Sequence, residues 1–291
     1  LSFKEAARQL NVSPSAVSQQ VKTLEDWLEM PLFERHTRRI SLTEAGRYYQ
    51  GVASDLVQTH KRGHAEFLRR FHNHSLHVSA PLFVAQELMI PGYLSFSDYM
   101  PATELRIEAR SSYVDFDSEP MDVAIRFGDG QWPQLQSRLL CGVSLAPVCS
   151  REYLQANPME QWSDLSHQKL IVPMADAPLW QTVLGEESID KQNLMICDSY
   201  LAAITSASKG LGVALALLPS SNNWINDGRL VMPFNIEIKT HFAYWMVAPA
   251  TRSESGELDA FYQWAKGLFD TVANLQQPLQ QVELPLQGRS I

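Results

Sequence analysis

The sequence predicts an α+β multidomain protein with a short helical head, one long helix and a larger α/β region. Two short helical patterns separated by a tight turn lie near the N-terminus, and one long helical pattern follows them. From about residue 76 onward, strand-like and helix-like stretches alternate along the chain. With 291 residues, the chain is long enough for two or three domains.

Charge is spread unevenly along the chain. Residues 1–75 carry 11 Lys and Arg against 8 Asp and Glu, a net charge of +3, whereas the remainder carries 13 against 24, a net −11. A basic head on an acidic body suggests that only the head meets a phosphate backbone, because the acidic body would be repelled from it.

Composition narrows the class of protein. Hydrophobic residues make up 45% of the chain, which is enough for packed cores and argues against disorder. No apolar run reaches about 18 residues and no signal peptide is visible, so we expect a cytoplasmic protein without a membrane partner. The three cysteines form no CxxC pair and are interpreted as buried packing residues in a reducing compartment: Cys141, Cys149 and Cys197.

The first short helix has clear boundaries. Ser2 and Glu5 have the spacing of a capping box, which predicts a helix over about residues 3–10. Asn11 tolerates the left-handed conformation that ends many helices. A turn is therefore expected directly before the second helix.

A second helix is predicted over about residues 14–28, because Ser13 is a suitable cap and Pro14 suits a first turn. Its apolar side chains form one inward stripe: Val17, Val21, Leu24 and Leu28. The candidate DNA-contacting residues begin at its first turn and follow the other side: Pro14, Ser15, Ser18, Gln19 and Lys22. Such a face can hydrogen-bond base edges in the major groove. A plain amphipathic surface helix is the alternative.

A basic hairpin is predicted directly after this helix. Residues 31–35 and 39–42 have the pattern of two short strands joined by residues 36–38. The hairpin gathers three arginines: Arg35, Arg38 and Arg39. Such a wing can contact backbone phosphates or the adjacent minor groove. A solvated charge run is the alternative, but the position after the reading helix favours DNA.

The motifs AARQL, SAVSQQVKTLE, PLFER and RRISLTEAG resemble the DNA-binding domain of the LysR-type transcriptional regulators. The match is dense over about the first fifty residues. It implies a winged helix-turn-helix DNA-binding domain at residues 1–46 that binds double-stranded promoter DNA. Because the match begins at the family's second helix, we expect the first helix to be missing from the chain.

Thr43 is predicted to cap a long helix over about residues 44–71. Its apolar positions lie near the 3.5-residue spacing of helices that pair with a twin: Ala45, Tyr49, Val52, Leu56, Gly63 and Phe67. In LysR-type regulators a linker helix here forms an antiparallel dimer. The resemblance implies the same for residues 47–75, and a homotetramer built as a dimer of dimers. Packing of the helix on its own chain is the alternative.

Three histidines close the linker: His72, His74 and His77. Their spacing would suit a metal site, but no carboxylate or cysteine lies beside them. The segment also joins a helix to a strand. We therefore interpret it as a polar hinge and expect neither a metal nor another cofactor.

Beyond the hinge, alternating patterns predict open, mostly parallel α/β sheets. The predicted strands cover residues 76–79, 105–109, 121–127, 139–150, 170–172, 213–218 and 242–248. The predicted helices cover residues 83–100, interrupted at Pro91, then 199–209 and 257–275. Residues 276–291 predict a loose tail.

These residues resemble the effector-binding region of LysR-type regulators, which is similar to periplasmic binding proteins. The resemblance implies an effector-binding domain at residues 76–291 with two α/β lobes crossed twice by the chain. The expected parts are lobe 1 at 76–148 and 251–275, lobe 2 at 149–250, with crossings near 147–151 and 248–252. The motifs DVAIRFGDGQWP, LAPVCS, GLGVALAL and LVMPF are most similar to the branch of glycine-cleavage and β-lactamase activators.

Ligands of such folds lie between the lobes, where helix N-termini offer N–H groups to anions. The candidate effector-binding residues are Ser79, Phe83, Arg126, Asp198 and Ser199. The guanidinium of Arg126 could meet a carboxylate, and Ser199 could cap a helix and touch a ligand. Roles as cap, core or salt bridge are the alternative for each. Phe83 replaces a hydroxyl usual in that branch, so we expect an effector larger or more apolar than free glycine.

The sequence favours a transcriptional regulator that senses a small-molecule effector and alters promoter contacts, with RNA polymerase as a further partner. Two alternatives remain. One is a binding module with a non-functional DNA-binding head. The other is an α/β enzyme, although no GxSxG, GxGxxG, Walker or zinc-binding spacing is present.

Overall fold

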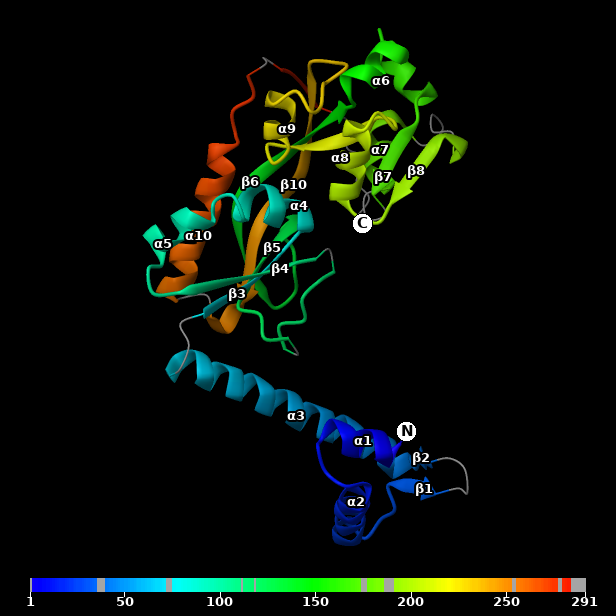
Figure 1. Ribbon diagram of the computed structural model, residues 1–291, viewed down its shortest axis with the longest axis vertical. Helices are drawn as coiled ribbons and strands as arrows, with labels where there is room; N and C mark the ends of the chain where they lie inside the picture. Colours follow the sequence, from blue (N-terminus) through cyan, green and yellow to red (C-terminus); the bar gives the residue numbers. More distant parts are fainter. Residues whose placement is uncertain are drawn as a thin grey trace. The chain divides into compact units, whose positions relative to one another are not determined.

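The computed structural model describes residues 2–35, 40–71, 75–110, 112–117, 119–173, 177–185, 191–252, 255–276 and 279–283. Contacts within the chain divide it into two compact units, residues 1–72 and residues 73–291. Figure 1 shows a unit of helices with one hairpin and a larger unit built around a sheet. Each unit has a different internal organisation.

The first unit follows the predicted order of elements. These are α1 (Phe3–Gln9), α2 (Pro14–Leu28), β1 (Phe33–Arg35), β2 (Ile40–Leu42) and α3 (Glu44–Phe71). The two strands are antiparallel, with Phe33 opposite Leu42. The two short helices, the hairpin and the long helix are therefore confirmed, although residues 36–39 of the hairpin lie outside the described residues.

Short polar side chains mark the helix ends in this unit. The hydroxyl oxygens of Ser2 and Ser13 accept hydrogen bonds from backbone N–H groups in the first turns of α1 and α2. Thr43 accepts one from Gly46 at 2.9 Å at the start of α3. Asn11 takes the predicted left-handed conformation with φ of 53°. These caps satisfy N–H groups that a helix leaves unpaired, which explains the accuracy of the predicted starts.

The apolar stripe of α2 is shielded only in part. Val17, Val21, Leu24 and Leu28 are each half-buried, and α2 has no fully buried residue. Ala7 and Leu32 are the buried apolar side chains in the described part of this unit. The first unit thus has little apolar core of its own.

A seven-stranded sheet dominates the described part of the second unit, with the order β4-β3-β5-β10-β6-β9 and β11 beside β10. Its strands are β3 (Ser75–Ala80), β4 (Glu104–Ala109), β5 (Val123–Gly128), β6 (Leu135–Val148), β9 (Ala214–Leu218), β10 (Ile236–Pro249) and β11 (Gln280–Glu283). A parallel pair stands apart from it: β7 (Leu170–Pro173) and β8 (Leu194–Cys197).

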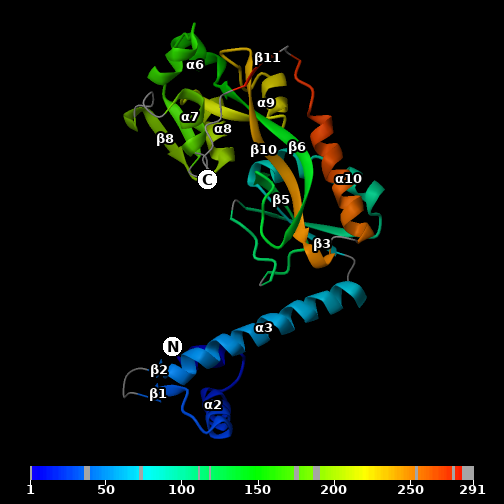
Figure 2. The ribbon, with the colours of Figure 1, turned by 180° about the vertical axis from the view of Figure 1, so that it is seen from behind.

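The helices of this unit pack around the strands (Figures 1 and 2). Those of the N-terminal half are α4 (Leu82–Val84), the π-helix η1 (Ala85–Met89), α5 (Tyr93–Tyr99), α6 (Arg151–Ala156) and the 3-10 helix η2 (Trp162–His167). The others are α7 (Ala177–Leu184), η5 (Lys191–Asn193), α8 (Tyr200–Ser208), α9 (Asn222–Asn226), η6 (Ala250–Arg252) and α10 (Gly256–Thr271). Both views place α5 beside α10.

Two expectations about this unit are wrong. The sheet is mixed rather than mostly parallel, because the two 14-residue strands β6 and β10 run antiparallel to each other. Strands β5 and β9 each pair antiparallel with one of them. The predicted loose tail contains β11, which pairs parallel with β10. Residues 284–291 of that tail lie outside the described residues.

The long strands β6 and β10 connect two regions of the unit. Residues 243–247 of β10 pair with β5, whereas residues 236–239 pair with β11, and the β10–β6 register shifts between these two segments. The lobe boundaries stay predictions.

Candidate functional site

One face of α2 carries the candidate base-reading side chains. Ser18 and Gln19 each lie three or four residues from both Ser15 and Lys22, so the four side chains lie on one side of the helix. Ser15, Gln19 and Lys22 are exposed and Ser18 is half-buried, while Pro14 occupies the first turn. The face offers hydroxyl, amide and ammonium groups, which together can donate to and accept from base edges.

The carboxylate of Glu25 fixes the end of this helix to the hairpin. It accepts backbone N–H groups from Leu32 at 2.8 Å and Phe33 at 2.9 Å. Charged acceptors make the stronger hydrogen bonds in proteins. Glu25 was missed by the sequence reasoning, since a Glu on the flank of an amphipathic helix usually faces solvent.

Gly46 allows α3 to approach the hairpin. A Cβ atom at this position would lie 2.0 Å from the carbonyl oxygen of Leu32. Thr43 donates its hydroxyl to the Pro31 carbonyl at 2.8 Å, and its N–H donates to the Leu32 carbonyl at 3.0 Å. The segment between α2 and β1 is therefore held from both sides, by Glu25 and by the start of α3.

The predicted arginine wing is described only in part. Arg35 ends β1 opposite Ile40, and Arg38 and Arg39 lie outside the described residues. The strand that leads to them is held by Glu25. The hairpin thus keeps a fixed relation to α2.

Several large apolar side chains of α3 are exposed to solvent in the single chain. Leu56 is 64% exposed and Phe67 is 54% exposed, and Tyr48, Val52 and Val57 are exposed too. A monomeric protein rarely exposes so many large apolar side chains on one helix.

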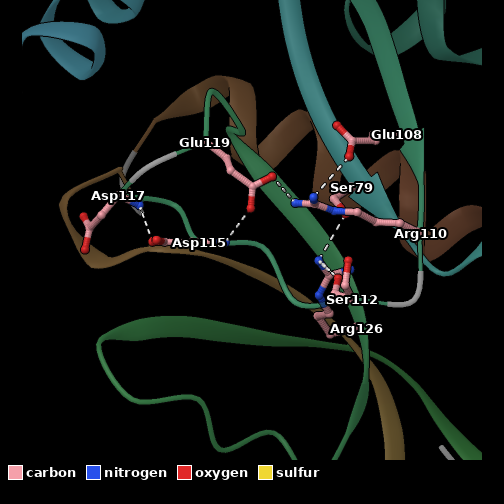
Figure 3. A network of polar contacts seen from close by, with 8 residues as sticks. All are labelled: Ser79, Glu108, Arg110, Ser112, Asp115, Asp117, Glu119 and Arg126. Carbon is pink, nitrogen blue, oxygen red and sulfur yellow. Dashed lines mark hydrogen bonds and ion pairs between the residues drawn. The ribbon is translucent and has the colours of Figure 1, made fainter. Parts of the chain in front are cut away.

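In the second unit, the structure brings Ser79 and Arg126 into contact (Figure 3). Arg126 lies on β5 and is only 6% exposed. Its guanidinium donates to the Ser79 hydroxyl at 3.1 Å, to the Ile125 carbonyl at 3.0 Å and to the Ser112 carbonyl at 3.4 Å. No carboxylate in the described part of the chain forms an ion pair with it.

A second arginine beside it is neutralised. Arg110 forms ion pairs with Glu108 and Glu119. The backbone N–H of Asp115 and then Arg110 hold the pKa of Glu119 below its usual value. Burial, and next the charge of Arg110, lower the pKa of Arg126 to about 10, so its guanidinium remains charged at neutral pH. The cluster therefore contains one buried positive charge without an ion-paired carboxylate.

Phe83 does not line open space. The ring is 2% exposed and packs edge-on against Tyr200, with centroids 4.9 Å apart, and against Trp224 at 5.9 Å. Glu87, on the following turn, accepts a hydrogen bond from the Trp224 indole at 2.7 Å. The start of α4 is thereby joined to α8 and α9.

Ser199 caps α8 by accepting from the backbone N–H of Ala202, and Asp198 is exposed beside it. Tyr200 was not among the predicted residues. Its hydroxyl oxygen accepts the Leu217 N–H at 2.7 Å and lies 2.7 Å from the Ser221 hydroxyl. No local spacing signals this role, because its partners lie about twenty residues away.

The described part of the chain was also compared with the requirements of metal, thiol and membrane sites. It contains no group of three potential metal ligands, and His72 and His74 lie outside it while His77 is on β3. Burial raises the pKa of Cys149 to about 12, which keeps the thiol protonated at neutral pH. No helix in the described residues is both long and apolar enough to cross a membrane.

Comparison with known proteins agrees with this architecture. A family model described as "LysR substrate binding domain" matches residues 69–270, and "Bacterial regulatory helix-turn-helix protein, lysR family" matches residues 1–47. The glycine cleavage system transcriptional activator of Escherichia coli (strain K12) is 34% identical over 272 residues, which cover 91% of this chain and 88% of that protein. The HTH-type transcriptional activator AmpR of Citrobacter freundii is 28% identical, with 92% of each chain covered.

Solved structures show the same fold. The AmpR effector binding domain from Citrobacter freundii covers 68% of this chain and 100% of its own, with a TM-score of 0.59 and 24% identity. CrgA from Neisseria meningitidis covers 94% of both chains, with a TM-score of 0.55 and 22% identity. The predicted fold, a helix-turn-helix followed by a two-lobed α/β effector-binding domain, is confirmed. The chain belongs to the LysR family and is a DNA-binding transcriptional regulator with an effector-binding domain, not an enzyme.

Proposed function

We propose that α2 reads promoter DNA in the major groove while the hairpin contacts the adjacent backbone. The observation that carries this is the exposed donor face of α2, held in a fixed relation to the hairpin by Glu25. Ser15, Ser18 and Gln19 contact base edges, each good contact contributing about 1–3 kcal/mol of discrimination. The phosphates are contacted by the first turn and the basic side chains: Pro14, Lys22, Arg35, Arg38 and Arg39.

We call α2 and the hairpin of one chain a reader, and two readers bind DNA together. The exposed apolar side chains of α3 pack against the same helix of a second copy, which places two readers on a pseudo-palindromic site. A tetramer, formed as a dimer of dimers, contacts RNA polymerase from its promoter site in the cytoplasm. The basic head and acidic body keep the DNA contact local.

The effector is an organic anion that binds at Arg126. The positive charge of Arg126 is buried, and no carboxylate of the described residues forms an ion pair with it. The Ser79 hydroxyl lies beside the guanidinium. Asp198 and Ser199 precede Tyr200, whose ring packs against Phe83, and we assign them to the other side of this site. Binding changes lobe closure, and the coupling to DNA equals the difference in effector affinity between the two closure states.

Free glycine is a poor fit to this site. The ring of Phe83 occupies the start of α4, where no hydroxyl is available for a small carboxylate. Calorimetry on the whole chain should show no tight glycine binding. Tight binding would remove this part of the proposal.

DNA titrations test the reader against the alternative of a non-functional head. DNA duplexes from the region upstream of the gene for this chain should bind the protein. Lys22→Ala and Arg38→Ala should each weaken binding to all DNA sequences by the same factor. Each should also reduce the slope of log affinity against log salt by about 0.9. Arg151→Ala, an exposed arginine on α6, is the matched control. Identical binding by both variants and wild type would reject the assignment.

Carboxylate titrations test the effector site. Acetate, benzoate and glycine can be compared by calorimetry on wild type, Arg126→Met and Arg126→Lys. Any carboxylate that binds should lose at least about tenfold in affinity in Arg126→Met, because a charged hydrogen-bonding partner is removed. Arg126→Lys should retain part of it, and Arg151→Met is the control. Equal affinity in Arg126→Met would exclude this site.

A further inference from the structure

A cavity lies where β6, β9 and β10 come together, beside α9 and the segment that follows α10. Its volume is about 280 Å³, and its walls include Ser144, Leu218, Asn222, Glu237 and Leu275. Neither Ser79 nor Arg126 lines it. The cavity is therefore separate from the anion site proposed above.

The polar residues that line this cavity are Ser144, Asn222 and Glu237. Glu237 is half-buried, and one carboxylate oxygen accepts the Ser144 hydroxyl at 3.2 Å. Among the described residues, no Lys, Arg or His forms an ion pair with Glu237. Its negative charge is available to a ligand.

Asn222 adds a buried acceptor. The residue is 1% exposed, and its amide NH₂ donates to the carbonyls of Val272 at 2.8 Å and Ala273 at 3.2 Å. These two bonds fix the orientation of the amide. Its carbonyl oxygen has no donor within the described part of the chain. A buried acceptor left in this way costs free energy unless a donor reaches it.

We propose that this cavity binds a small organic cation, an ammonium group carried on a short apolar body. An ammonium has three N–H donors and no acceptor, which matches Glu237 and Asn222. The apolar body fits against Leu218 and Leu275. A carboxylate ligand is disfavoured here, because it would meet the charge of Glu237.

The place of the cavity gives the cation a regulatory consequence. Beside it, the β10–β6 register shifts between Lys239 and Ala243, and the Thr240 hydroxyl donates to the Val143 carbonyl at 2.6 Å. A bound cation would contact the long strands that connect the two regions of the unit. It therefore acts as a second input, distinct from the anionic effector, on the arrangement of these strands.

Calorimetry on the whole chain tests this site with cyclohexylammonium and n-butylammonium chloride as probes. Cyclohexanol and cyclohexanecarboxylate share the ring and differ in charge, so both should bind more weakly than cyclohexylammonium. Glu237→Gln keeps the shape, removes the charge and should weaken ammonium binding by about tenfold or more. Glu160→Gln, at an exposed glutamate, is the matched control and should change nothing.

Arg126→Met separates this inference from the proposed anion site, because ammonium binding should be unchanged in that variant. Near-ultraviolet circular dichroism of each variant shows whether the fold is retained. The proposal is overturned if neither ammonium binds, if the carboxylate binds as tightly, or if Glu237→Gln and Glu160→Gln behave alike. Loss of ammonium binding in Arg126→Met would also contradict a separate site.

Discussion

Different interactions stabilise the interior of each of the two units of this regulator. In the described part of the first unit, Ala7 and Leu32 are the buried apolar side chains, and polar side chains such as Glu25 and Thr43 fix the backbone. The second unit buries large aromatic rings, among them Trp180 and Trp264. The head thus depends on a few specific hydrogen bonds and close approaches, whereas the effector unit depends on apolar burial.

The largest effect that separates the units is expected from Phe83→Ala. The ring packs on Tyr200 and Trp224, so its loss should destabilise the second unit by about 3–5 kcal/mol. Hydrogen exchange followed peptide by peptide should show faster opening in residues 73–291 and no change in α1 or α2. Phe83→Leu, which keeps part of the apolar volume, should lose less. Wild-type protection in Phe83→Ala would mean that the ring carries little stability.

Gly46→Ala should produce the next largest loss of stability, and this loss should occur in the first unit. The added methyl would meet the Leu32 carbonyl oxygen at 2.0 Å, which should cost about 3 kcal/mol and weaken DNA binding. Gly51→Ala in the same helix is the control, because a Cβ there meets nothing within 4 Å. That change should stabilise the helix by about 1 kcal/mol. If Gly46→Ala and Gly51→Ala unfold at the same temperature, the close approach of Gly46 to Leu32 does not limit the stability of this unit.

Glu25→Ala should destabilise the hairpin by about 2 kcal/mol, because two backbone N–H groups lose a charged acceptor. Nuclear magnetic resonance amide exchange at Leu32 and Phe33 measures this directly. Asp26→Ala, at the exposed neighbouring carboxylate, should leave exchange unchanged. Protected amides in Glu25→Ala would show that other contacts hold the hairpin.

Ser13→Ala should have the smallest effect on stability, about 1 kcal/mol, through loss of the cap that accepts the Ala16 N–H at 3.1 Å. Helix content of the head, measured by circular dichroism on heating, reports it. Ser13→Asp provides an equivalent oxygen and should restore the wild-type curve. A curve for Ser13→Asp that matches Ser13→Ala would contradict the capping role.

The same contrast explains what the sequence could predict. The start of α2 was predicted correctly because Ser13 and Pro14 act on backbone groups within three residues, and α3 begins after Thr43 for the same reason. The hairpin follows from a short alternating pattern. Such signals depend on neighbours in sequence and can therefore be recognised without the structure.

Long-range contacts could not be predicted in this way. The loose tail proved to contain β11, because its pairing with β10 joins segments about forty residues apart. The packing of Phe83 on Tyr200 and the buried amide of Asn222 depend on similar distant contacts. Arg126 was proposed because its guanidinium could meet a carboxylate. Only the structure adds its burial and the pairing of Arg110 with carboxylates instead.

The central claim is that one face of α2 reads sequence, and paired substitutions on the two sides of that helix test it most directly. Gln19 and Gln20 are both exposed and chemically identical, but only Gln19 lies on the proposed reading face. Fluorescence anisotropy can compare affinity for the upstream site with affinity for the same site carrying base changes. Gln19→Ala should lower the discrimination between the two sites, expressed as a free-energy difference, by about 1–3 kcal/mol. Gln20→Ala should leave this difference unchanged. An unchanged difference in Gln19→Ala, or an equal loss in Gln20→Ala, would contradict the claim.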